Sequence, residues 1–203
     1  MMNSTQLHEF IRSRRSVRRF SPEAIEDDVL KRLLNTATHA PSAHNRQPWR
    51  FVVITTEEHR SKLAEAMKAE FARDMAADGV AEVERVQAIE RSRQRITSAP
   101  AAILLCCDMS DMDEYPDDRR SRAEHTMAVQ SVSNAGATLL LAAHAEGLGG
   151  VWICAPLFAP ESVATALELP ASWEPQALLL IGRPTHTPPP RPRRELAGVA
   201  LYR

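Results

Sequence analysis

The chain has 203 residues, 44% of them hydrophobic, so it is long enough to form one sizeable core. Its 25 Lys and Arg residues nearly balance its 26 Asp and Glu residues, and this gives no reason to expect nucleic acid or an acidic membrane as a partner. Because we find no secretory signal, no membrane-spanning run and no metal-ligand spacing of the three cysteines, we expect one cytoplasmic domain over residues 1–203, without metal or disulfide.

A basic segment, RSRRSVRRF, follows a short helix predicted over residues 4–13 with Ser4 as its cap. Alternate residues of an extended segment point to the same side, so Arg14, Ser16 and Arg18 can face one ligand. Arginine binds phosphate oxygens through two parallel hydrogen bonds. We therefore favour a site for a phosphate or an anionic cofactor, with a nucleic-acid or targeting patch as the alternative.

The segment APSAHNRQPWRF, residues 40–51, follows a helix that apolar spacing predicts over residues 25–38. Its two prolines interrupt regular structure, which predicts a rigid loop. Ser42, Asn45 and Gln47 offer a hydroxyl and two amides, which can donate and accept hydrogen bonds along the polar edge of a flavin ring. The alternative is that these side chains tie the loop to its own backbone.

Strands and helices alternate along the rest of the chain. Short apolar runs predict strands at residues 51–54, 101–107, 151–154 and 177–181, and helical spacing predicts helices at residues 119–146 and 160–169. Residues 57–97 predict two more helices, a charged insertion that is either a solvated surface or a lid. The middle of the 119–146 helix is rich in small residues and leucine, so we expect it to be buried nearly all round. Together these elements predict an α+β or mixed three-layer domain.

No side chain in this sequence is an obvious catalyst. A nucleophile-elbow pattern, a metal-ligand cluster and a phosphate-binding glycine loop are all missing, so we expect the reactive group to be a bound cofactor. His44 is consistent with a loop-bonding group or with a proton donor. A thiol at Cys154 could react beside a flavin, but we expect an inert, buried cysteine, because free cysteine is among the residues most often buried.

Four segments in this order, RRSVRRF, APSAHNRQPWRF, GLGGVWICAPLF and RPRR after IGRP, resemble the FMN-dependent nitroreductase family. The charged insertion and WICAPLF make the chain most similar to the nitroreductase-type domain associated with deazaflavin-coenzyme glutamyl ligases. The resemblance implies an α+β fold, a three-layer α/β/α sandwich whose central mixed sheet has four to five strands flanked by helices. It also implies a homodimer with FMN at the interface.

Carried over by position, the resemblance implies the residues of an FMN site. The phosphate, ribityl chain and pyrimidine side would meet Arg14, Arg15, Ser16 and Arg18, with Arg191 and Arg193 completing the phosphate site. The polar ring edge would meet Ser42, Asn45 and Gln47, and the reactive ring nitrogen would lie near Ile153, Cys154, Ala155 and Leu157. Because Pro156 has no N–H, Ala155 or Leu157 would donate a backbone hydrogen bond to that nitrogen.

The expected function is therefore an FMN oxidoreductase that takes hydride from NADH or NADPH. It would pass electrons to a small conjugated acceptor such as a nitroaromatic, a quinone or an enone. Donor and acceptor would use one flavin face in turn, which predicts ping-pong kinetics with no catalytic side chain. One alternative is an enzyme that acts on a deazaflavin coenzyme or its precursor, and another is a flavin-binding module without turnover.

Overall fold

A computed structural model describes residues 3–203 of the chain. The helices are α1 (Ser4–Ser13), α2 (Asp27–Ala37), α3 (Glu57–Ala77), α4 (Glu82–Thr97), α5 (Asp118–Ala145) and α6 (Pro160–Ala166), with short 3-10 helices η1 (Ala43–Asn45), η2 (Ala155–Phe158) and η3 (Leu196–Gly198). The strands are β1 (Trp49–Ile54), β2 (Ala101–Asp108), β3 (Gly149–Ile153) and β4 (Trp173–Gly182). Every predicted helix and strand is present, and β4 begins well before the predicted residue 177.

The four strands form one sheet in the order β1-β2-β4-β3, and all neighbouring strands are antiparallel. The expectation of a mixed sheet is therefore wrong for these strands. Within residues 3–203 the single parallel pairing is an isolated bridge between Ser16 and Gly150, beside β3. The reason lies in the insertion between β1 and β2: the antiparallel pair α3 and α4 returns the chain to the end at which β1 stopped, whereas one crossover helix would give a parallel pair.

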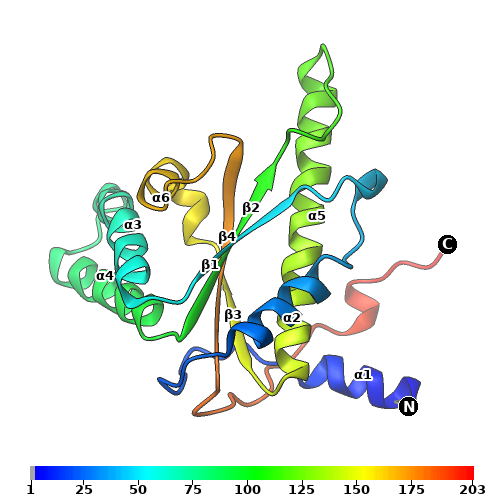
Figure 1. Cartoon of the computed structure of the whole chain (residues 1–203), viewed down its shortest axis with the longest axis horizontal. Helices are drawn as coiled ribbons and strands as arrows, with labels where there is room; N and C mark the ends of the chain where they lie inside the picture. The colour runs from blue at the N-terminus through cyan, green and yellow to red at the C-terminus, as the bar shows by residue number, and fades with distance from the viewer. Residues whose placement is uncertain (1–2) are drawn as a thin grey trace.

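Helices cover both faces of the sheet (Figure 1), with α2 and α5 on one side and α3, α4 and α6 on the other. Successive residues of β2 serve the two sides in turn, as the period of a strand requires. Ile103 and Leu105 pack in the core under α2 and α5, whereas Ala102 and Leu104 pack in the core under α3 and α6. The predicted α+β three-layer fold is confirmed.

Helix α5 is buried along one face only. Asn134 and Ala137 are exposed in this chain, so the expectation of burial all round is wrong for the single chain. The small residues instead allow close packing on the sheet. A Cβ atom at Gly136 would lie 2.4 Å from both Leu105 Cδ1 and Trp152 Cζ3, so only glycine fits where the helix crosses the sheet.

Helix α1 begins with a capping box. Asn3 accepts a hydrogen bond from the Gln6 N–H at 2.9 Å, and the Gln6 side chain accepts one from the Asn3 N–H at 2.9 Å. Ser4 is therefore not the cap, because the longer Asn3 side chain satisfies the free donor from one position earlier.

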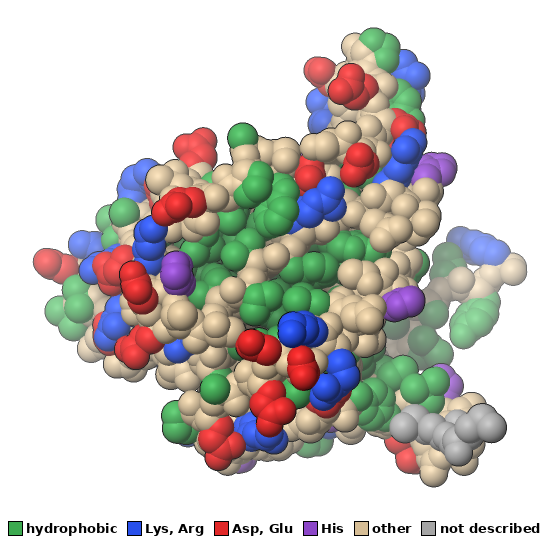
Figure 2. All heavy atoms as spheres, viewed as in Figure 1, with side chains coloured by type: hydrophobic (Ala, Val, Ile, Leu, Met, Phe, Trp, Pro, Cys, Tyr) green, Lys and Arg blue, Asp and Glu red, His purple; other side chains and the backbone are tan. Residues whose placement is uncertain are grey.

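Apolar side chains are exposed near both ends of the chain. On α1, Leu7 and Ile11 are 49% and 46% exposed. In the C-terminal segment, which runs away from the body in Figure 1, Leu196, Val199, Leu201 and Tyr202 are 60–83% exposed. No residue of 186–203 is buried. Figure 2 shows further hydrophobic side chains over the middle of the viewed face, with charged side chains along the edge formed by α3 and α4.

The charged residues of the insertion form short-range pairs on an exposed surface. Lys68 contacts Glu65 at 3.0 Å and Arg93 contacts Glu90 at 2.9 Å, each within one helix. These contacts support the solvated-surface interpretation of those charges. Within residues 3–203, no helix is long and apolar enough to cross a membrane.

Candidate functional site

The loop over residues 41–47 holds three residues in the left-handed backbone region. His44, Asn45 and Gln47 have φ angles of 49°, 54° and 51°, which cost roughly 1–2 kcal/mol for each residue that is not glycine. The loop is closed by hydrogen bonds to itself: the Gln47 N–H donates to Ser42 Oγ at 3.2 Å, and Gln47 Nε2 donates to Asn45 Oδ1 at 3.3 Å. Strain of this kind persists where the surrounding structure fixes it, and it is frequent at ligand sites.

Helix α5 anchors the other side of this loop. Ser131 Oγ accepts a hydrogen bond from the Ala43 N–H at 3.2 Å, and Asn134 Nδ2 donates to the Pro41 carbonyl at 3.3 Å. Sequence reasoning missed these two partners, because they are distant in the chain and lie in a helix whose composition suggested packing alone. Ser42, Asn45 and Gln47 thus all take part in hydrogen bonds within the loop, as the self-bonding alternative expects, and Asn45 and Gln47 are also exposed.

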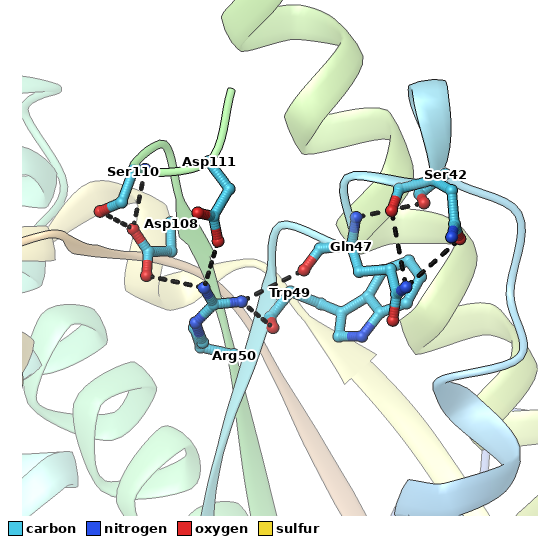
Figure 3. Close-up of polar contacts among 8 residues, drawn as sticks. Ser42, Gln47, Trp49, Arg50, Asp108, Ser110 and Asp111 are labelled. Atoms are coloured by element: carbon cyan, nitrogen blue, oxygen red, sulfur yellow. Dashed lines mark hydrogen bonds and ion pairs between the residues drawn. The ribbon is translucent and has the colours of Figure 1, made fainter. Parts of the chain in front are cut away.

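Arg50 fixes the end of the loop to the end of β2 (Figure 3). Its Nη1 donates to the carbonyls of Gln47 and Trp49 at 3.1 and 3.0 Å, and its Nη2 lies 3.0 Å from Asp108 Oδ2. Burial acts to raise the pKa of Asp108, but hydrogen bonds from Ser110 and the charge of Arg50 outweigh it, and the pKa lies below its ordinary value. The Arg50–Asp108 pair was missed by sequence reasoning, although both residues directly flank predicted elements.

A group of positive charges gathers around Arg14, which is half-buried. Burial, followed by the charges of Arg193 and Arg15, lowers the pKa of Arg14. Burial, followed by Arg14 and Arg15, likewise lowers the pKa of His144. Within residues 3–203, no carboxylate forms an ion pair with Arg14, Arg15 or Arg193. Two segments from opposite ends of the chain thus meet in a cationic site, and the phosphate of FMN fits its charge.

The other predicted phosphate ligands are Ser16, Arg18 and Arg191. Ser16 pairs with Gly150 beside β3, where the neighbouring Val17 N–H donates to the Gly150 carbonyl at 3.1 Å. Arg191 is exposed. Arg18 lines a separate groove near the start of β2. The structure therefore brings Arg193 near Arg14 and Arg15, and the assignment of Arg18 to the FMN site stays a prediction.

Cys154 is exposed, so the expectation of a buried cysteine is wrong. It lies just past the end of β3 and leaves the sheet there, while its Sγ accepts a hydrogen bond from Trp152 Nε1 at 3.2 Å. The buried cysteines are Cys106 and Cys107 in the central strand β2, where burial raises the pKa of each thiol to about 12.

The turn after β3 favours one of the two candidate backbone donors. The Leu157 N–H donates to the Cys154 carbonyl at 3.0 Å within the turn that opens η2. A donor already engaged in this way is not free for a ligand. Ala155, one of the two residues flanking Pro156, is therefore the better candidate.

A cavity of about 350 Å³ lies between the helical insertion and η2. Its apolar lining comes mainly from Met67, Phe71, Met75, Ile89 and Phe158. Its volume falls within the range of small-molecule pockets, and it adjoins the turn that carries Ala155. Within the described chain, no group of three or more His, Cys, Asp or Glu side chains could hold a metal ion.

Comparison with known proteins agrees with this arrangement. Residues 11–183 match the model of the nitroreductase family. The chain belongs to the nitroreductase family. A 5,6-dimethylbenzimidazole synthase from Rhodospirillum rubrum is 35% identical over 181 residues, which cover 87% of this chain and 81% of that protein.

Solved structures of the nitroreductase fold cover nearly the whole chain. A nitroreductase in complex with FMN from Desulfovibrio desulfuricans is 27% identical, has a TM-score of 0.75, and is matched over 100% of this chain and 98% of that one. A BluB-like flavoprotein from Clostridium difficile 630 has a TM-score of 0.81 at 20% identity over 97% of this chain and 98% of that one, which shows the fold alone. The family resemblance is confirmed, and the finer similarity to the domain associated with deazaflavin-coenzyme ligases stays a prediction.

Proposed function

We propose that this nitroreductase-family protein is an FMN-dependent oxidoreductase that takes hydride from NADH or NADPH and passes electrons to a small conjugated acceptor. The observation that carries the proposal is the meeting of Arg14, Arg15 and Arg193 without a carboxylate partner among residues 3–203. A relative of known structure that is 27% identical contains FMN, and a flavin phosphate would balance this positive charge.

In this proposal, bound FMN supplies the hydride-accepting and hydride-donating chemistry, and the protein supplies binding and orientation. Arg14, Arg15 and Arg193 bind the phosphate. The amides of Asn45 and Gln47 bind the polar ring edge from a loop that its own hydrogen bonds already hold in place. Such a loop loses little conformational freedom when a ligand binds.

The remaining predicted ligands belong to the same proposal. Ser16 lies on the segment that pairs with β3, Ser42 closes the loop, and the Ala155 N–H is the proposed donor to the reactive ring nitrogen. Ile153, Cys154 and Leu157 flank that donor. Arg18 and Arg191 remain predicted ligands of the ribityl and phosphate groups.

The acceptor would enter the apolar cavity between the insertion and η2. Met67, Phe71 and Phe158 provide soft, flat contact surfaces, which suit a conjugated molecule. The residues assigned to the FMN site include no paired acid and base, which is consistent with chemistry that resides on the cofactor.

We also propose a homodimer with FMN at the interface. The exposed apolar side chains of α1 and of the C-terminal segment have no cover in the single chain, and the outer face of α5 is likewise open. A second subunit would cover such surfaces.

The test begins with the visible spectrum of the purified protein, before and after anaerobic addition of NADH or NADPH. We expect a yellow protein that releases FMN on denaturation, bleaches with one of the donors, and shows parallel initial-rate lines when donor and acceptor are varied. A colourless protein that cannot be reconstituted with FMN would sink the proposal. Cys154→Ala and His44→Ala should keep most of the flavin-reduction rate, whereas loss of an acid–base catalyst typically costs roughly 10²–10⁴-fold.

A second candidate function comes from the 35% identity to a 5,6-dimethylbenzimidazole synthase. Mass spectrometry of mixtures containing the protein, FMN and a nicotinamide donor would reveal that product. A deazaflavin coenzyme or its precursor is the other candidate acceptor, and its consumption would be followed by absorbance. A flavin-binding module would hold FMN but turn over none of these acceptors.

A further inference from the structure

A second basic site lies outside the Arg14 group. The segment after α1, the first turn of α3, the C-terminal half of α4 and residues 98–100 before β2 together line an open groove of about 900 Å³. Figure 1 shows where α3 and α4 lie in the fold. The charged lining of the groove consists of five arginines, Arg18, Arg19, Arg60, Arg91 and Arg95, and one carboxylate, Glu57. The whole chain has a formal net charge of −1, so this is a local concentration of positive charge.

None of these five arginines forms an ion pair with a carboxylate within residues 3–203. The other face of α4 is different, since Arg93 there contacts Glu90 at 2.9 Å. Like charges at Arg91 and Arg95 are one helical turn apart, a spacing that destabilises a helix unless an anion lies between them. The groove therefore concentrates charge that the protein itself does not neutralise.

Arg60 lines the groove and is held in position by backbone carbonyls. It is only 8% exposed, and it donates from Nη1 to the carbonyls of Thr55 and Pro100 at 2.7 and 3.2 Å and from Nε to the Thr97 carbonyl at 3.3 Å. These bonds do not use Nη2. Burial lowers the pKa of Arg60, and the charge of Glu57 opposes this shift without cancelling it.

We propose that this groove binds the oligophosphate group of a nucleotide. Several arginines converging from three segments suit a ligand with more than one phosphate, because each guanidinium can bind two phosphate oxygens. The volume exceeds what a single phosphate needs and lies within the range of nucleotide-sized pockets. Phe20 and Pro22 offer apolar contact to a base, and Gln94 and Thr97 offer polar groups. The inference does not depend on FMN binding.

Calorimetric titration with pyrophosphate tests the proposal, on protein saturated with FMN and on protein without added FMN. We expect one pyrophosphate site that remains on the FMN-saturated protein, whereas protein without FMN can also bind pyrophosphate at the Arg14 group. The double variant Arg91→Gln, Arg95→Gln should weaken its binding by at least about tenfold, because charge-assisted hydrogen bonds are lost. The matched control is Arg119→Gln, Arg122→Gln on α5, which removes the same charge from exposed positions and should change binding less than about twofold.

Titrations with ADP and NADPH then distinguish the sources of the oligophosphate. ADP binding that NADPH does not displace assigns the groove to a free nucleotide, and displacement by NADPH assigns it to the nicotinamide donor; both outcomes support the proposal. Absence of pyrophosphate binding at low ionic strength, or an equal loss in the groove and control variants, would overturn it. Failure to bind FMN would contradict the proposed function and leave the pyrophosphate result unaffected.

Discussion

The loop over residues 41–47 and the C-terminal segment over residues 186–203 are both predicted to hold FMN. Within the single chain the loop is held in place by hydrogen bonds, whereas the C-terminal segment has few contacts with the rest of the protein. The loop is held by α5, by Arg50 and by its own side chains. The C-terminal segment has no buried residue, and near the Arg14 group its Arg193 meets only like charge. Folding alone fixes the first region, whereas the second stays exposed in the single chain.

This difference indicates how such a site is assembled. Hydrogen bonds hold the strained loop in its shape before a ligand binds. Ligand binding therefore costs little conformational entropy in this loop. Arg193 lies close enough to Arg14 for the two like charges to repel. In the proposed site a phosphate between them would offset this repulsion, so ligand binding and ordering of the C-terminal segment should favour each other.

The largest effect is expected from removing apolar surface from the C-terminal segment. Burying such a side chain contributes roughly 1.5–3 kcal/mol, so Leu201→Ser with Tyr202→Ser should weaken a dimer at least about a hundredfold. Light scattering across a dilution series measures this change. Val83→Ser with Val86→Ser, at similarly exposed positions on α4, is the control. A double variant that dimerises like the parent protein would show that the segment contributes no interface.

A smaller effect is expected at the Arg14 group. Arg14→Ala should weaken FMN binding by about 1.5–3 kcal/mol through loss of charge-assisted hydrogen bonds. Equilibrium dialysis against FMN measures it. Arg119→Ala, an exposed arginine on α5, is the control, whereas Arg60 is unsuitable because it is buried and holds three carbonyls. Equal FMN affinity in both variants would place the phosphate elsewhere.

Breaking the ion pair between Arg50 and Asp108, next to the 41–47 loop, should lower the free energy of unfolding. Asp108→Asn should lower the free energy of unfolding by about 1–2 kcal/mol near pH 7, because Asp108 is 5% exposed and neutralises Arg50. Since the pKa of Asp108 is lowered in the folded protein, this contribution is present above the ordinary value of 3.8 and is lost as pH falls through the folded pKa. Urea unfolding at several pH values should therefore show the two proteins converging in acid.

Asp111→Asn is the matched control for Asp108→Asn, because Asp111 also pairs with Arg50. Asp111 lies 3.6 Å from Arg50 but its side chain is 69% exposed, so its removal should cost under about 0.5 kcal/mol. Equal losses for the two variants would mean that burial of Asp108 is not the reason for its effect.

The smallest effect concerns the strained backbone. Gln47→Gly should leave the free energy of unfolding unchanged or raise it by up to about 1 kcal/mol, because glycine accepts a positive φ, while FMN binding weakens. Glu168→Gly, at a φ of 53° outside the proposed site, should have the same effect on stability and none on FMN. A clear loss of stability at residue 47 alone would mean that its side-chain hydrogen bonds outweigh the strain.

The positions of helices and strands could be predicted because burial imposes a period on each element, as in β2, which packs on both faces. Whether neighbouring strands run parallel or antiparallel could not be predicted. Periodicity does not show whether the connection between two strands brings the chain back to the end of the sheet at which the first strand stopped. Within the candidate site, the polar loop was recognisable from its amides and prolines. Its anchors at Ser131, Asn134 and Asp108 were not, because they act across long separations in sequence.

The exposure of Cys154 escaped prediction for a related reason. It depends on where the chain leaves the sheet after β3, and side-chain type does not determine that. The resemblance to the nitroreductase family predicts the segments of the site, but it did not indicate that Arg18 lines a groove of its own.

The absence of a side chain at Gly136 allows the long helix α5 to pack closely on the sheet. Helix α5 has 28 residues, and at 1.5 Å per residue it is about 42 Å long. It crosses the sheet where Gly136 packs against Trp152 and Leu105, and its N-terminal end projects past the sheet (Figure 1). That end lies about 27 Å from Gly136, so a wedge that tilted the helix by about 5° would swing the tip by roughly 2 Å. A Cβ atom at residue 136 would require Leu105, Trp152 or α5 itself to shift. Any tilt of α5 would displace its N-terminal end most, far from the substitution.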